Sequence, residues 1–199
     1  MVILRRSNMQ VLSIQVGKPR LVTHGGRGVR TAIFKEPVLH RVRVRRRNLD
    51  GDAQADLRVH GGPDKAVYAY DLGGYEHWRR ELSRELPFGQ FGGNLTVEGM
   101  PETEVRIGDV YRVGTAVLQV SQPRSPCYKL AMRMESPRFL KPFLASGRTG
   151  FYLRVLEEGA IGAGDSIDLL TRDPESLTVE QTTRLIFGPK PQRVARNWK

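Results

Sequence analysis

The sequence has little cysteine and no long apolar segment. Its one cysteine, Cys127, excludes an intramolecular disulfide and fits a protein of a reducing cytosol. No apolar run approaches the roughly 20 residues that a membrane-spanning helix needs. The apolar part of the opening MVILRRSN is also too short for a secretory signal. We therefore expect a cytoplasmic protein without a membrane segment, with residues 1–8 as a loose leader.

Acidic residues are scarce relative to basic ones. The chain has 21 Asp and Glu against 32 Lys and Arg, a formal net charge of +11, and its pI is near 10.3. This excess indicates an anionic partner, which could be nucleic acid, an acidic protein surface or a phosphorylated small molecule. The 39% apolar and 27% charged residues are typical of a folded globular protein. The length of 199 residues suits one domain with a short appendage.

Alternation of apolar and polar residues predicts a mainly β protein. In the first candidate strand, Leu12, Ile14 and Val16 are expected on one face. Gly114-Thr115 is expected to form the turn of a tight hairpin. Short strands with glycine-rich connections favour a barrel or sandwich. The strand segments are 9–16, 38–44, 109–120 (two strands), 150–156 and 164–170.

Helices are fewer. Apolar residues recur at three- and four-residue intervals in 71–86, which predicts an amphipathic helix. Ser136-Pro137 resembles an N-cap followed by proline at the first helical position. Thr178 and Gln181 form a capping-box pattern. Because 171–177 separates this last helix from the strands, we expect a small C-terminal helical appendage.

The segment SQPRSPCYKL (121–130) contains the most informative candidate for chemistry. Pro123 and Pro126 restrict the backbone ahead of Cys127. The cations of Arg124 and Lys129 favour its thiolate, which is both the nucleophile and the metal-binding form of cysteine. The alternative is an inert, buried cysteine at a strand-to-helix corner. The flanking cations and proline favour the chemical interpretation.

A second candidate segment is ADLRVHGGPDKAVYAY (55–70). His60 precedes two glycines, where backbone amides can approach a ligand, and Lys65 adds a cation. A glycine turn beside a hydrogen-bonded histidine is the alternative. The glycine spacing matches neither a dinucleotide fingerprint nor a Walker loop. His60 also lacks a His or Cys partner at zinc spacing.

Two further segments contain polar candidates. Asn94 follows two glycines and precedes a strand in FGGNLTVEG (91–99). Thr31 and Lys35 in VRTAIFKEPV (29–38) are candidate phosphate ligands. A hydroxyl and an ammonium four residues apart are equally the surface of a solvated strand or loop.

The stretch RVRVRRR (41–47) holds five arginines. It could contact nucleic-acid phosphates, or it could be the solvated face of a strand and its following loop. No aromatic residue interleaves with these arginines, as base stacking would require. We therefore prefer the solvated strand.

Taken together, these segments resemble the MOSC family (the C-terminal domain of molybdenum cofactor sulfurases), and within it the YiiM-type bacterial branch. The matching blocks occur in the same order over nearly all of residues 9–170. They read VRTAIFKEPV, GDAQADLRVHGGPDKAVYAY, FGGNLTVEG, RIGDVYRVGTAVLQVSQPRSPCYKL, GRTGFYLRVL and AGDSIDLL.

The resemblance implies a β-barrel-like MOSC domain over 9–170, a short C-terminal helical appendage over 171–199, and a molybdenum–pyranopterin cofactor. Cys127 corresponds to the family's metal-binding cysteine. Basic side chains would hold the pterin phosphate. His60 or Tyr152 would assist proton transfer. The cofactor-binding candidates are Asn94, Arg124 and Tyr152, followed by Thr31, Lys35, His60 and Lys65.

By the same resemblance, the chain would reduce N-hydroxylated compounds such as hydroxylaminopurines or amidoximes. A flavoprotein or iron–sulfur protein would supply electrons; pyridoxal phosphate is not expected. One alternative is a molybdopterin carrier or sulfur-transfer module without turnover. A basic nucleic-acid-binding barrel is the other, and specific nucleic-acid binding is the less favoured. Two features depart from the family: Gly93 replaces an expected glutamate, and the C-terminal segment is shortened.

Overall fold

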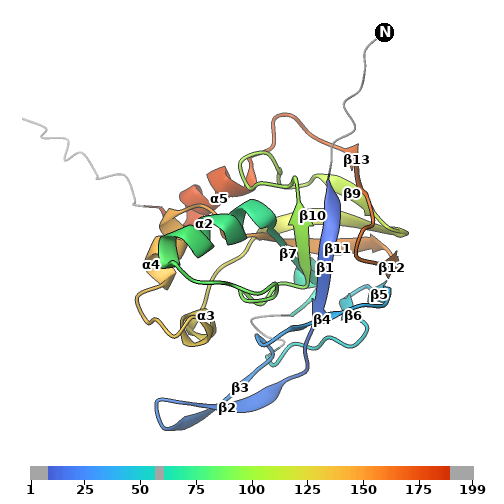
Figure 1. Ribbon diagram of the computed structural model, residues 1–199. Coiled ribbons are helices and arrows are strands. Elements are labelled where there is room, and N and C mark those ends of the chain that lie inside the picture. The colour runs from blue at the N-terminus through green and yellow to red at the C-terminus, as the bar shows by residue number, and fades with distance from the viewer. Residues whose placement is uncertain (1–8, 57–60, 189–199) are drawn as a thin grey trace, which may run out of the picture.

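The computed structural model describes residues 9–56 and 61–188 and is built mainly of strands (Figure 1). The strands are β1 (Gln10–Val16), β2 (Arg20–His24), β3 (Arg27–Thr31), β4 (Glu36–Val38), β5 (Val42–Arg45), β6 (Asn48–Leu49), β7 (Val67–Asp71), β8 (Leu95–Glu98), β9 (Val110–Val113), β10 (Ala116–Pro123), β11 (Phe151–Glu157), β12 (Gly159–Ile161) and β13 (Ile167–Thr171). The helices are η1 (Pro63–Lys65, a 3-10 turn), α2 (Leu72–Leu82), α3 (Tyr128–Arg133), α4 (Leu140–Ala145) and α5 (Val179–Phe187).

Eight strands form one curved sheet in the order β13-β9-β10-β11-β7-β8-β1-β4. Its neighbours are antiparallel except for β7 and β8, which are parallel. The curvature brings the two sides of the sheet together where Val11 N–H donates to Asp165 O at 2.9 Å and Gly164 N–H donates to Val11 O at 2.7 Å. Only an isolated bridge joins Gln10 to Ser166 there. The expected mainly β, barrel-like architecture is thus confirmed, with a seam in place of a continuous closing ladder.

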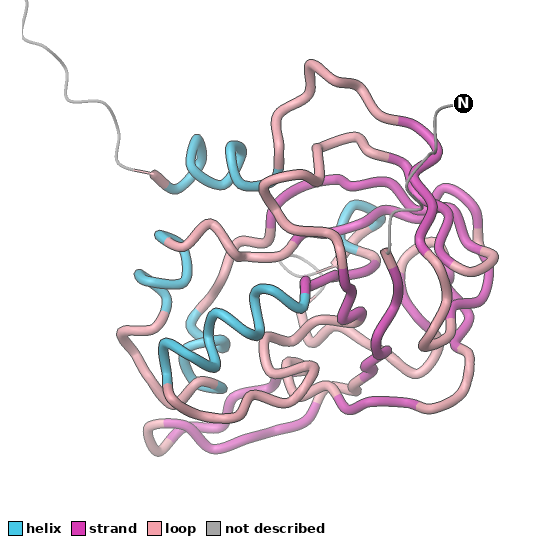
Figure 2. The backbone as a smooth tube through the Cα atoms, turned by 45° about the horizontal axis from the view of Figure 1, so that its top comes forward, coloured by secondary structure: helices cyan, strands magenta, loops and turns pink. Residues whose placement is uncertain are grey.

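Smaller sheets and helices complete the fold. Strands β12, β5 and β6 form a three-stranded sheet, and β2 and β3 form a two-stranded one. The helices gather on one side of the main sheet (Figures 1 and 2). Rings of Tyr70, Tyr75, Trp78, Phe91 and Phe143 form an aromatic cluster between them and the sheet. Among the described residues, no helix is both long and apolar enough to cross a membrane.

Strand β1 differs from its predicted alternation. A register shift lies between Val11 and Ser13 where β1 pairs with β8. Val11 and Ile14 are therefore both fully buried, whereas Leu12 is only half-buried and lies outside the core. Placing Leu12 on the same face as Ile14 was wrong, because the bulge breaks the two-residue period.

The predicted strand 38–44 is divided between two sheets. Strand β4 ends at Val38 on the edge of the main sheet, and β5 begins at Val42 in the three-stranded sheet. Leu39 between them is fully exposed. Val42 and Val44 are buried as their alternation indicates.

The predicted hairpin is confirmed: β9 and β10 pair across Gly114 and Thr115, with a φ of 56° at Gly114. Helix α2 is confirmed too, capped by the Asp71 carboxylate, which accepts from Gly73 N–H, but it ends at Leu82 rather than at 86, because Ser83 has a left-handed backbone with a φ of 47°. The predicted start at Ser136-Pro137 was wrong, because a turn precedes α4, which begins at Leu140.

Helix α5 has the predicted capping box between Thr178 and Gln181. Its first turn is joined to the main fold, since Val179 N–H donates to Val105 O at 2.8 Å and the Val179 side chain lies in the main core. A separate appendage over 171–199 stays a prediction.

Candidate functional site

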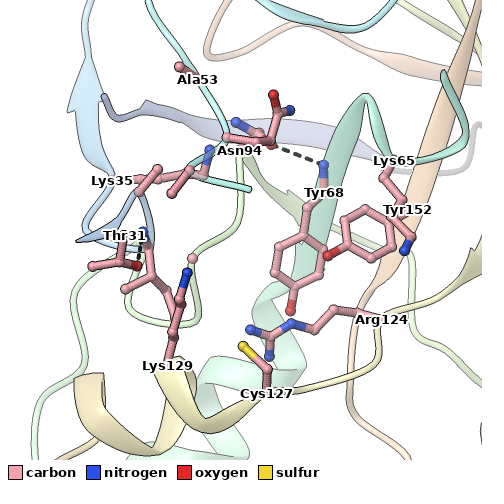
Figure 3. Close-up of a pocket in the computed structure, with 15 residues that line it drawn as sticks. Thr31, Lys35, Ala53, Lys65, Tyr68, Asn94, Arg124, Cys127, Lys129 and Tyr152 are labelled. Carbon is pink, nitrogen blue, oxygen red and sulfur yellow. Dashed lines mark hydrogen bonds between the residues drawn. The ribbon is translucent and has the colours of Figure 1, made fainter. Parts of the chain in front are cut away.

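A pocket opens between segments that lie far apart in the sequence (Figure 3). The empty space between its walls, which includes open solvent at its mouth, is about 610 Å³. The end of β3 and the segment after it, the loop after β6, η1, β7, the loop before β8, β11, the β10–α3 connection and the start of α3 all contribute to its walls. The lining residues are Thr31, Ala32, Ile33, Lys35, Ala53, Gln54, Ala55, Lys65, Tyr68, Gly92, Asn94, Arg124, Cys127, Lys129 and Tyr152.

The lining is strongly cationic. It includes Lys35, Lys65, Arg124 and Lys129 but no aspartate or glutamate. Low-dielectric walls concentrate the field of such a cluster, so the pocket favours an anionic ligand. Part of the chain's excess of basic residues is thus gathered at this pocket.

Arg124 is the most informative of these cations because it is buried and incompletely hydrogen-bonded. Only 6% of the residue is exposed, and its Nη1 has no hydrogen-bond partner among the described residues. The guanidinium carbon lies 5.2 Å from the Tyr68 ring centroid and 5.7 Å from that of Phe143. A buried donor without an acceptor is costly, and an anion in the pocket would supply that acceptor.

Cys127 lies at the corner between β10 and α3 with an extended backbone, at φ −124° and ψ 172°. It is half-buried, and its sulfur points into the pocket next to the Arg124 guanidinium (Figure 3). The Lys129 ammonium donates to Arg30 O at 3.1 Å, which joins α3 to β3 across the pocket wall. Cys127 thus lies at a strand-to-helix corner, as the alternative interpretation has it, but it is half-buried and its thiol faces a cationic cavity.

A buried ion pair supports the opposite wall. Lys35 Nζ lies 2.5 Å from the Asp52 carboxylate, and the two side chains are 9% and 0% exposed. Asp52 also accepts from Gly17 N–H at 2.8 Å. Burial lowers the pKa of Lys35 below its usual 10.5, and the neighbouring Asp52 charge opposes that effect. Asp52 therefore favours the charged ammonium of a pocket residue.

Asn94 lines the pocket, but its amide is occupied within the protein. Its Nδ2 donates to Asp52 Oδ2 at 2.9 Å and to Gln15 O at 3.3 Å. Its Oδ1 accepts from Tyr68 N–H at 3.1 Å. Since an amide has two N–H donors, only one lone pair of Oδ1 is left for a ligand. The contacts of Asn94 are those of a residue that positions Asp52 and, through it, Lys35.

Tyr68 and Tyr152 form an aromatic wall beside Arg124. Their ring centroids lie 5.4 Å apart at an interplanar angle of 44°. The Tyr68 hydroxyl donates to Thr149 O at 2.8 Å. Burial raises the pKa of both phenols above the usual 10, so both are protonated at neutral pH. Tyr152 therefore keeps its O–H at neutral pH and can donate a hydrogen bond, and it is a weaker acid than an exposed tyrosine.

The pocket gathers the predicted residues together with others that the sequence did not single out. Thr31 is buried, and its Oγ1 accepts from Ile33 N–H at 3.2 Å. His60 lies outside the described residues. Tyr68, which lines the pocket, and Asp52, which contacts Lys35 without lining it, are not distinguished by their local spacing in the sequence. The predicted residues that line the pocket are Thr31, Lys35, Lys65, Asn94, Arg124, Cys127 and Tyr152.

Gly93 is buried between two pocket residues but is not part of the lining. A Cβ built there would have its nearest contact, Tyr68 O, at 3.6 Å, an ordinary van der Waals distance. Its φ is not in the left-handed region, unlike the φ of 79° at Gly92. A Cβ therefore fits at position 93 without backbone strain.

The arginine-rich stretch 41–47 is largely bound within the protein. Arg41 Nη1 lies 2.7 Å from Asp165 and Arg45 Nε lies 3.1 Å from Asp50. Arg46 Nη1 donates to Leu156 O at 2.8 Å. These contacts favour the structural interpretation of the stretch. Over 9–56 and 61–188, no group of three or more His, Cys, Asp or Glu residues could hold a metal ion.

Comparison with known proteins identifies relatives over most of the chain. It is 43% identical to the uncharacterized protein YflK of Bacillus subtilis, covering 92% of this chain and 83% of that protein. It is 34% identical to YiiM of Escherichia coli, covering 80% and 72%. A protein of Gibberella moniliformis named "Reductase" is 36% identical over 88% of this chain, but this covers only 32% of the fungal protein.

Solved structures agree with this relationship. The crystal structure of YiiM from Geobacillus stearothermophilus matches with a TM-score of 0.74 and 38% identity, covering 89% of this chain and 83% of that one. That of YiiM from Escherichia coli gives 0.69 and 26%, covering 88% and 76%. The model of the MOSC domain matches residues 56–168. The chain belongs to the MOSC domain family and is related to its YiiM-type members.

Proposed function

We propose that the pocket binds a molybdenum–pyranopterin cofactor, with the Cys127 thiolate as the protein ligand of the metal. A thiolate is a soft ligand, which favours molybdenum over magnesium or calcium, because those two metals prefer oxygen ligands. The observation that carries the proposal is the buried Arg124, which lines the same cavity as Cys127 and whose Nη1 has no partner among the described residues. The phosphate of the pterin is the anion expected to satisfy such cations.

We further propose that the protein is a cytoplasmic reductase of N-hydroxylated compounds, such as hydroxylaminopurines or amidoximes. When bound, the cofactor would supply two-electron oxygen-atom chemistry. Overall, an N–OH group takes up two electrons and two protons and yields an N–H group and water. Kinship with YiiM and with a protein named as a reductase supports an enzymatic role. The electrons would come from a flavoprotein or an iron–sulfur protein.

The chain's own residues would divide the remaining tasks. Arg124 and Lys129 would bind anionic groups, and the Asp52-supported ammonium of Lys35 would hold a further one. The rings of Tyr68 and Tyr152 would orient a planar substrate by stacking. The protonated phenol of Tyr152 would donate a proton to the leaving oxygen.

Metal analysis and turnover on one preparation test this proposal. The protein is produced in a host that makes the cofactor, its molybdenum content is measured, and reduction of a hydroxylaminopurine is followed with reduced methyl viologen. We expect molybdenum and turnover in the wild type. Cys127→Ser should abolish turnover while the thermal unfolding curve stays nearly unchanged, because a half-buried serine fits the same volume.

The other outcomes are also informative. Molybdenum without turnover would indicate a cofactor carrier or sulfur-transfer module. If the purified protein contains neither molybdenum nor pterin, the remaining interpretation is a basic nucleic-acid-binding barrel. A fully active Cys127→Ser variant would refute the assigned metal ligand.

A further inference from the structure

Residues 18–31 form a projecting hairpin, called here the basic arm. Its strands β2 and β3 make a two-stranded sheet of their own, paired from Arg20–Thr31 to His24–Arg27. Figures 1 and 2 show the arm extending from the body of the molecule. The residues of its turn are exposed on both sides of the two glycines. Most residues of the arm are thus exposed and available to a partner rather than packed in a hydrophobic core.

The charge of the arm has one sign. Lys18, Arg20, Arg27 and Arg30 are all exposed, and the sequence from 17 to 35 contains no aspartate or glutamate. Arg20 lies 3.9 Å from the exposed Glu36. Within the described part of the chain, the other three form no salt bridge, in contrast to Arg41 and Arg45 of the arginine-rich stretch. The arm is therefore a concentrated, largely uncompensated positive surface.

Exposed apolar side chains accompany these charges. Leu21 on β2 is 75% exposed, and Tyr128 at the start of α3 is 56% exposed. The bond from Lys129 Nζ to Arg30 O, 3.1 Å long, holds the start of α3 against β3. Apolar residues surrounded by charged ones are the usual anatomy of a protein–protein interface.

The base of the arm is also a wall of the pocket. Strand β3 ends at Thr31, which lines the pocket together with Ala32 and Ile33. The guanidinium carbons of Arg20 and Arg133 lie 4.3 Å and 4.8 Å from the ring centroid of Phe34. A partner bound to the arm would therefore sit beside the pocket.

We propose that the basic arm is the docking surface for an acidic electron-donor protein, a small flavoprotein or iron–sulfur protein. This inference rests on the proposed reductase function. Each turnover would consume one electron from each of two donor molecules, together with two protons, and release the amine and water. Opposite charges speed the encounter of transient redox partners, whose interfaces are small. Nucleic acid is the less favoured occupant because residues 18–31 contain no Phe, Tyr or Trp on which bases could stack.

Binding is tested with oxidised flavodoxin, an acidic flavoprotein, as the probe. The test variant is Arg27→Glu/Arg30→Glu, and the matched control is Arg43→Glu/Arg47→Glu, an equal change of charge at exposed arginines outside the arm. At low salt the test variant should bind at least about tenfold more weakly and the control within about threefold of wild type. Wild-type binding should weaken as salt rises.

Turnover with two reductants separates docking from catalysis. With reduced flavodoxin, Arg27→Glu/Arg30→Glu should lose at least about tenfold in rate, whereas its rate with reduced methyl viologen should equal that of wild type. Equal losses in the test and control variants, or none in either, would overturn the proposal. So would an arm-dependent affinity for a DNA oligonucleotide that exceeds the affinity for flavodoxin. If wild type fails with viologen, the proposed function is wrong, and the binding comparison still decides the role of the arm.

Discussion

Replacing Asp52 by asparagine would remove a buried charge with little change in volume. The carboxylate is fully buried and faces three donors: Lys35 Nζ, Gly17 N–H at 2.8 Å and Asn94 Nδ2 at 2.9 Å. An asparagine amide would turn one NH₂ group toward these donors. It would also leave the Lys35 ammonium, only 9% exposed, without its counter-charge.

Breaking a buried ion pair from one side costs about 3–5 kcal/mol, because the remaining charge stays desolvated. Domains of this kind are stable by roughly 5–15 kcal/mol, so we expect Asp52→Asn to lose a large fraction of the free energy of unfolding. Conversion of Asp52 to alanine would add a cavity to this effect. Because asparagine has nearly the same volume as aspartate, Asp52→Asn measures the effect of removing the charge without adding a cavity.

The loss should depend on pH with a defined sign. Burial already lowers the pKa of Lys35 below 10.5, and Asp52 opposes this shift. Without Asp52 the folded-state pKa falls further. Between that lowered pKa and 10.5 the unfolded chain binds a proton that the folded chain lacks. The stability of Asp52→Asn should therefore rise with pH across this window, more steeply than that of wild type.

Urea unfolding at about pH 7 and about pH 9.5 measures both effects. The control is Lys35→Met/Asp52→Asn, which removes both charges and should recover most of the lost stability. An Asp52→Asn protein within about 1 kcal/mol of wild type at the lower pH would refute the argument, since that is the spread of ordinary substitutions. A double variant no more stable than Asp52→Asn would also refute it.

Three further predictions concern other parts of the molecule. Gly93→Glu should change turnover of N-hydroxylated substrates more than thermal stability, because a Cβ there has room; unchanged turnover in a stably folded variant would place Gly93 outside the working site. Burial raises the pKa of Glu102 to about 7 from 4.5, so stability should fall by roughly 3 kcal/mol as pH rises through that interval, and Glu102→Gln should flatten the profile in denaturant titrations. Duplex DNA should bind weakly and lose affinity steeply with salt, as non-specific contacts do; sequence-specific submicromolar binding at physiological salt would contradict this expectation.

Local patterns predicted the elements whose stability is decided within a few residues. The Gly114-Thr115 turn requires a positive φ, which glycine readily adopts, so the β9–β10 hairpin could be predicted from the sequence. The capping box of Thr178 and Gln181 likewise satisfies backbone donors within one turn. The bulge in β1 was not predictable, because it depends on the register with β8 about 80 residues away.

The candidate pocket shows the same division. Cys127 and Arg124 are close in sequence, and their type and spacing already indicated a thiol in a cationic setting. The resemblance to MOSC proteins added the more distant candidates. Only the tertiary structure shows that the Asn94 amide hydrogen-bonds to Asp52, Gln15 and Tyr68. It also shows that Asp52 forms a buried ion pair with Lys35. These partners are brought together by strand pairing over long separations, and hydrogen-bond saturation depends on geometry that residue types alone do not determine.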